Sequence, residues 1–99
     1  MIIVAGTVRI DPSRRDAARE VMERMITASR AEDGCIEYSY AVDVLDPSVI
    51  RVYEVWRDRE SLQAHFRTPH LQAWREAWHG FGITDRKLQL FEVASASPL

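Results

Sequence analysis

The sequence predicts an α+β fold whose elements follow the order strand, helix, strand, strand, helix, strand. Three observations support this order: apolar and polar residues alternate in the middle of the chain, apolar residues recur at helical spacing in two other segments, and turn-forming residues separate these segments. With 99 residues, the chain has the length of one domain. We expect a single domain over residues 1–94 and a flexible tail over residues 95–99.

The first strand and the first helix are predicted from residues 2 to 34. Residues 2–10 are β-branched and mostly apolar, which predicts a strand buried on both faces. Asp11 and Pro12 are typical of a helix start, because aspartate caps the first turn and proline suits the first helical position. Gly34 ends the helix by supplying a left-handed position. The apolar residues between them follow helical spacing: Ala18, Val21, Met22, Met25 and Ile26.

A hairpin is predicted over residues 35–57. Residues 35–44 and 49–57 form its strands, because both segments alternate, and residues 45–48 have the composition of a turn. In the first of these strands, one side is expected to carry Ile36, Tyr38, Tyr40 and Val42. In the second, one face is expected to carry Val52, Glu54 and Trp56.

The second half of the chain predicts a helix in two parts and a last strand. Asp58 caps a short helix that runs to Phe66. Thr68 and Pro69 repeat the start signal and open a further helix to about residue 79, where glycines break it. Leu71, Trp74 and Trp78 lie at core spacing in this helix, and residues 83–93 read as a strand.

The predicted order is the ferredoxin-like βαββαβ arrangement, an antiparallel four-stranded sheet with helices on one face. The helices cover only one side of the sheet, yet apolar or aromatic residues occupy both sides of the first strands. A large exposed apolar sheet is an association site. We therefore expect a homodimer in which two sheets face each other.

Composition excludes several classes of partner. The formal net charge is −2 and no segment is a basic block, so we expect no nucleic-acid partner. No apolar run approaches the roughly 20 residues of a membrane span, so we expect no membrane partner. The single cysteine, Cys35, excludes an internal disulfide and a cysteine zinc cage. These features are consistent with a cytoplasmic location.

Three segments resemble the antibiotic biosynthesis monooxygenase family, and within it the small quinol-monooxygenase-type members. They are EDGCIEY at 32–38, VYEVWRD at 52–58 and LQAHFRTPHL at 62–71. The resemblance covers nearly the whole chain. It implies a dimeric α/β barrel with a pocket between the helices and the sheet.

His65 is the candidate catalytic base. It follows Leu62 by three residues, so both side chains should point toward the sheet, and a histidine there can titrate near neutral pH. Glu54 is its expected partner, because a carboxylate that points under a helix needs one, and the pair would raise the pKa of the histidine. Alternatively, His65 is a structural histidine and Glu54 bonds an arginine or a backbone cap.

Further site residues are implied by the resemblance. In the anthrone-oxidising branch of the family, the pocket tryptophan matches Trp56 and the pocket arginine matches Arg75, so both are expected to donate to a substrate anion. Trp56 could instead be an ordinary core tryptophan. The substrate pocket is expected to be lined by Val52, Leu62, Phe66 and His70.

We expect no cofactor and no metal. There is no glycine-rich phosphate loop, and no element carries histidines at ligand spacing, apart from His65 and His70 on either side of a helix break. The haem-degrading branch of the family has a tryptophan at the position of His65 and a histidine at the position of Arg75, so haem is not expected here.

These residues predict a cofactor-independent monooxygenase that oxidises an electron-rich phenol, hydroquinone or anthrone-like substrate with O2. Such chemistry needs a dry apolar pocket, a base and a donor to the substrate anion. The expected partners are a small aromatic molecule and O2. Two alternatives remain open: a proton-shuttling isomerase of a small signal metabolite, and a non-catalytic ligand-binding or stress domain.

Overall fold

The computed structural model describes residues 1–99 and confirms the predicted order of elements. The second helix is divided in two, as predicted, and a short 3-10 turn flanks each helical region. In chain order the elements are β1 (Ile2–Arg9), a 3-10 turn (Pro12–Arg14), α1 (Arg15–Arg30), β2 (Cys35–Val42), β3 (Val49–Trp56), α2 (Arg59–Phe66), α3 (Pro69–Ala77), a second 3-10 turn (His79–Phe81) and β4 (Thr84–Glu92).

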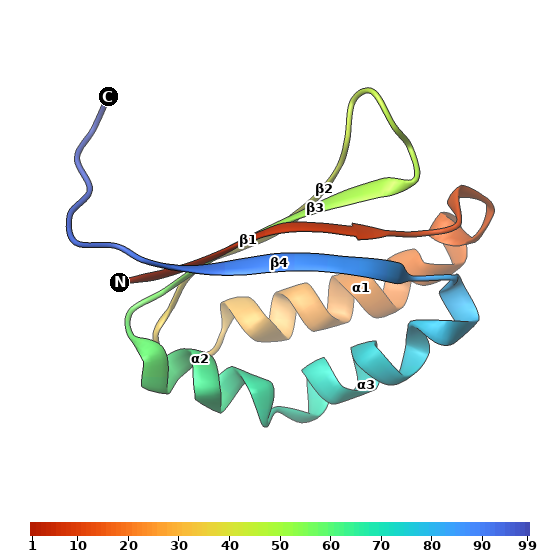
Figure 1. Ribbon diagram of the computed structural model, residues 1–99. Helices are drawn as coiled ribbons and strands as arrows, with labels where there is room; N and C mark the ends of the chain where they lie inside the picture. The colour runs from red at the N-terminus through yellow and green to blue at the C-terminus, as the bar shows by residue number, and fades with distance from the viewer.

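The four strands form one antiparallel sheet in the order β2-β3-β1-β4, and all three helices lie against the same face (Figure 1). The register aligns Tyr38 with Glu54, Glu54 with Val4, and Val4 with Leu90. Directly opposed residues share a face, so these four side chains form a row under the helices. The predicted α+β, ferredoxin-like architecture is confirmed. No helix is long and apolar enough to cross a membrane.

The predicted helix starts are also confirmed. Asp11 accepts a hydrogen bond from the Ser13 amide at 3.0 Å, and Asp58 accepts one from the Ser61 amide at 2.8 Å. The Thr68 hydroxyl caps α3 in the same way. These caps satisfy amide groups that would otherwise lack a partner at the start of a helix.

Gly34 allows the turn after α1 to lie close to the start of α2. Its φ of +84° is in the left-handed region, and a β-carbon there would come within 2.1 Å of the Ser61 hydroxyl oxygen. Glycine is therefore required at this position both for its backbone conformation and for its small size. The close approach brings the residues just before Gly34 beside α2.

The core lies between the sheet and the helices. Trp56 and Trp74 are fully buried there, which confirms the predicted core position of Trp74. Trp78 is only partly buried and packs against the edge of this core.

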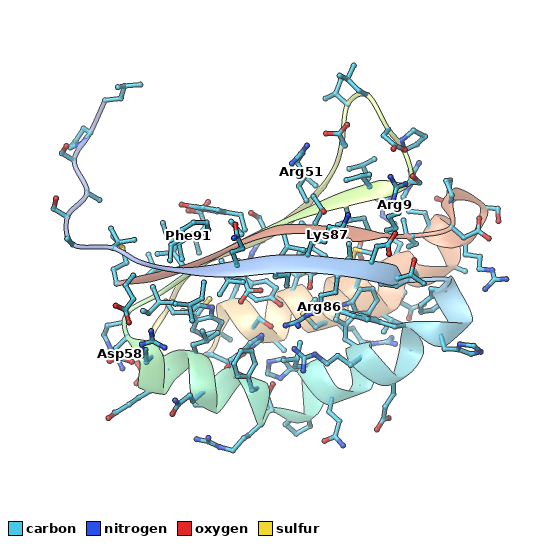
Figure 2. All side chains as sticks on the ribbon, viewed as in Figure 1. Arg9, Arg51, Asp58, Arg86, Lys87 and Phe91 are labelled. Atoms are coloured by element: carbon cyan, nitrogen blue, oxygen red, sulfur yellow. The ribbon has the colours of Figure 1, made fainter.

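Two predictions about the sheet are wrong. A register shift between Cys35 and Glu37 leaves Ile36 60% exposed, so Ile36 does not share the buried side of Tyr38. The first strand is fully buried only on its helix side, at Ile2, Val4 and Val8, while its other side is half-covered within one chain. That free face carries polar side chains at one end and Phe91 at the other (Figure 2).

Candidate functional site

A small, partly open cavity lies between the sheet and the helices α2 and α3, where the family resemblance implies a pocket. Four acidic or basic side chains line it: Glu54, His65, Arg75 and Arg86. The rest of the lining is apolar or aromatic: Val4, Val8, Tyr38, Tyr40, Val52, Phe66, Leu71, Trp78 and Leu88. Another hollow, between α1 and β2, is larger, but none of the acidic or basic residues that line it is buried. We therefore place the site in the first cavity.

The last turn of α2 holds His65 against the sheet. Leu62 and His65 are both buried, which confirms the predicted direction of this helix face. The imidazole ring centre lies 4.7 Å from that of Trp56 and 5.3 Å from that of Tyr38. These aromatic neighbours keep the ring in an apolar environment.

Glu32 is the hydrogen-bond partner of His65. The Nδ1 atom of His65 lies 2.6 Å from Oε2 of Glu32, and the Nε2 atom of His70 lies 2.8 Å from the same oxygen. A carboxylate only accepts hydrogen bonds, so each imidazole donates to it. With its proton on Nδ1, His65 has a lone pair on Nε2, the atom that can act as a base.

The predicted pairing of His65 with Glu54 is wrong. Glu54 accepts a hydrogen bond from the indole N–H of Trp56 at 2.9 Å, two residues along the same strand. His65 is instead reached by Glu32, from a turn 33 residues earlier in the chain. The alternation within one strand could not reveal a partner that arrives from a different element.

The environment lowers the pKa of His65, where the sequence predicted a raised value. Burial disfavours the charged imidazolium and outweighs the hydrogen bond and negative charge of Glu32, which act in the opposite direction. The positive charges of His70 and Arg75 add to the lowering. His65 is therefore neutral, and able to accept a proton, at neutral pH.

Burial has the opposite effect on Glu54 and raises its pKa to about 7. The hydrogen bond from Trp56 and the charges of Arg86 and Arg75 oppose this rise. Glu54 is 6% exposed and lines the cavity, so it exchanges a proton near neutral pH beside any bound ligand. The Trp56 indole N–H already donates to Glu54, so Trp56 could donate to a substrate oxygen, as the sequence predicted, only by giving up its hydrogen bond to Glu54.

The remaining predicted residues divide into two groups. Val52, Phe66 and Arg75 line the cavity, and the Arg75 guanidinium lies 5.7 Å from the centre of the Phe66 ring. Leu62 and His70 are not among the residues that line this cavity. Leu62 belongs to the packed core, and His70 turns toward Glu32.

Two site residues were missed by the sequence analysis. Glu32 is the first residue of the EDG segment, and nothing in that segment indicates that its partner is a histidine. Arg86 lies on β4 and points under the sheet, toward the helices (Figure 2). Its two-residue spacing from Leu88 was a usable signal, because alternate strand residues share a face.

Glu32, His65 and His70 are also the residues that could hold a metal ion, since their ligand atoms lie within 4.8 Å of one another. The two nitrogen–oxygen distances, 2.6 and 2.8 Å, are those of direct hydrogen bonds. A divalent metal about 2.0–2.2 Å from each ligand would hold the ligand atoms roughly 3 Å or more apart.

The fold and the cavity define a small ferredoxin-like domain with a buried histidine–glutamate pair beside an apolar pocket. The sequence pattern of the antibiotic biosynthesis monooxygenase family matches residues 1–77. The chain belongs to this family.

The chain is also similar to individual proteins and to a solved structure. The probable quinol monooxygenase YgiN of Escherichia coli (strain K12) is 29% identical over 90 residues, covering 81% of this chain and 86% of its own. An uncharacterised protein of Synechocystis is 29% identical over 98 residues, covering 99% of this chain and 67% of its own. The crystal structure of a Deinococcus radiodurans protein described under the same family name covers 100% of this chain and 98% of its own, with a TM-score of 0.91 and 24% identity.

Proposed function

We propose that this protein is a cofactor-independent monooxygenase that oxidises an electron-rich phenol, hydroquinone or anthrone-like molecule with O2. The observation that carries the proposal is His65, a buried neutral histidine that lines an apolar cavity and is held at Nδ1 by Glu32. The family assignment supports the reaction class, and the name of the Escherichia coli relative supports a quinol as the substrate type.

The proposed reaction begins with proton transfer from the substrate to Nε2 of His65. Glu32 stabilises the imidazolium that forms, because its carboxylate accepts the Nδ1 proton in a charge-assisted hydrogen bond. The substrate anion passes one electron to O2, and the two radicals combine into a peroxide. Loss of water from this peroxide leaves one oxygen atom in the quinone product and releases the other as water.

Glu54 and Arg75 have supporting roles in this scheme. Arg75 stabilises the substrate anion from the α3 side of the cavity, as a guanidinium does for an oxyanion. Glu54, which is partly protonated at neutral pH, supplies the proton that the leaving water requires. The apolar lining keeps bulk water away from the anion and the peroxide.

We also propose that the protein acts as a homodimer, with the free faces of two sheets together. Tyr53 and Phe91 support this, because both large side chains are exposed on that face, at 39% and 46%. Large side chains with apolar surface exposed on one face favour association.

The reaction is tested by incubating the chelator-dialysed protein with hydroquinones and anthrones, with and without 18O2. The proposal predicts O2 consumption and one labelled oxygen atom per product molecule. Conversion that proceeds equally well without O2 would instead identify a proton-shuttling isomerase, which the presence of two titratable groups in one cavity also favours.

A further inference from the structure

Arg86 lines the cavity from an exposed position on the edge strand β4, on the side that it shares with Leu88. The strand is irregular just before it. Thr7 pairs with Lys87 and Arg9 pairs with Thr84, so two residues, Asp85 and Arg86, stand opposite the single residue between Thr7 and Arg9. This is a β-bulge, a feature that redirects side chains and is common next to functional sites.

The bulge has a local conformational cost. Asp85 adopts a φ of +51°, in the left-handed region that side chains other than glycine rarely occupy. A salt bridge between Asp85 and Arg9, at 3.6 Å, helps to hold this conformation. The Arg86 side chain, next along the strand, lies on the helix side of the sheet (Figure 2).

Arg86 has no partner within the protein. Arg67, Arg75 and Arg86 are the only arginines without a salt bridge or a hydrogen bond to a protein oxygen. Arg75 and Arg86 both line the cavity, one from α3 and the other from β4. The two unpaired guanidinium groups thus belong to the same site.

The charges that line the cavity do not balance. Two arginines face one carboxylate, Glu54, while His65 is neutral, so the cavity keeps a positive charge even when Glu54 is ionised. An unbalanced cationic site within an apolar lining favours an anionic ligand. Guanidinium groups pair with carboxylates through two parallel hydrogen bonds.

We propose that the cavity binds aromatic substrates that carry a carboxylate, and that Arg86, together with Arg75, binds this carboxylate. The inference that the substrate is aromatic rests on the proposed function, whereas the inference that it is an anion rests on the two arginines. The phenolic part of the ligand then lies against the aromatic lining and within reach of His65.

The test compares hydroquinone with 2,5-dihydroxybenzoate, which has the same ring and adds one carboxylate. Binding of each is measured by isothermal titration calorimetry under argon, so that no turnover is needed. The proteins are the wild type, Arg86→Gln and Lys87→Gln. Lys87 is the matched control, because it is the next residue and a cation, yet lies on the opposite face of the same strand (Figure 2).

The wild type should bind the carboxylated ligand at least about tenfold more tightly than hydroquinone. Arg86→Gln should weaken binding of the carboxylated ligand by about 10- to 100-fold, the usual range for a lost hydrogen bond to a charged group, and leave hydroquinone almost unchanged. Lys87→Gln should match the wild type with both ligands.

Equal affinity of the wild type for the two ligands, or equal losses in Arg86→Gln and Lys87→Gln, would overturn the proposal. A parallel assay in air separates it from the proposed oxygenase activity. The predicted affinities without O2 consumption would leave the anion site standing and contradict the oxygenase. Oxidation of hydroquinone without preference for the carboxylated ligand would support the oxygenase and contradict the anion site.

Discussion

Glu32 controls the chemistry of His65 through a single carboxylate oxygen that accepts hydrogen bonds from two imidazoles. His70 therefore acts on His65 indirectly, by fixing the position of Glu32. Such a support fixes both the tautomer and the orientation of the ring, which a base needs in order to meet its substrate.

Glu32→Gln should lower kcat by about 10- to 100-fold, because the amide cannot stabilise the imidazolium as a carboxylate does. It should also shift the acid-side midpoint of the pH–rate profile downward, since the charge of Glu32 raises the pKa of His65. Asp33→Asn is the control, because Asp33 is the neighbouring acid and its side chain points to solvent. Matching profiles in the two variants would count against the role of Glu32.

Glu54 should make stability depend on pH. Its pKa is raised from 4.5 to about 7 by folding, so the folded state holds this proton more tightly than the unfolded state. The resulting stabilisation is complete below pH 4.5 and is lost as the pH rises through 7. Urea titrations should show the difference between wild type and Glu54→Gln changing by up to about 3 kcal/mol between pH 5 and 8. A constant difference over this range would show that Glu54 titrates normally.

Among the elements, the junction between the turn after α1 and the start of α2 is critical, because it brings Glu32 to His65. Gly34 makes this approach possible, and Asp58 fixes the first turn of α2. The sequence predicted the cap at Asp58. It also predicted that Gly34 ends the first helix, but α1 already ends at Arg30, and the left-handed glycine belongs to the turn that follows. The sequence did not predict the contact between Glu32 and His65, because these residues belong to different elements that meet only in the folded chain.

Gly34→Ala should lower the free energy of unfolding by about 1–2 kcal/mol or more, because the new β-carbon would meet Ser61 and the backbone would be strained. It should also reduce activity, since α2 must shift away from Glu32. Gly80→Ala is the matched control, because nothing lies within 4 Å of a β-carbon built there. Urea titration and the oxygen assay should show an effect of Gly34→Ala only; equal losses in both variants would contradict this account.

At the scale of the whole molecule, the fold followed from local patterns. The helix caps at Asp11, Asp58 and Thr68 and the alternation in β3 depend on neighbours in sequence, and all were predictable. The partners of His65 and Glu54 depend on tertiary contacts, and they were not. The bulge that exposes Ile36 was also missed, because a register shift leaves no clear mark in an alternating segment.

The proposed dimer is the prediction for the assembly. Light scattering at micromolar concentration should give a mass of twice the 11.4 kDa of one chain. Tyr53→Arg should shift the protein toward the monomer, because it places a charge on the exposed face of β3. A wild type that remains at 11.4 kDa would show that the free faces do not associate.

The most direct test of the central claim is the pH dependence of oxygen consumption in wild type and in variants of His65. On the acid side, the wild-type rate should rise with pH through one ionisation below the usual histidine value of about 6.5, because burial lowers the pKa of the base. It should fall again as Glu54, with a pKa of about 7, loses the proton that it supplies. His65→Ala should lower kcat at pH 7 by about 10²–10⁴-fold and remove the acid-side ionisation. His65→Gln, which keeps a donor for Glu32, should lose as much activity and remain folded. His79→Ala, which removes an exposed histidine, should match the wild type. A folded His65→Gln protein that oxidises hydroquinones at the wild-type rate would contradict the assignment of His65 as the base.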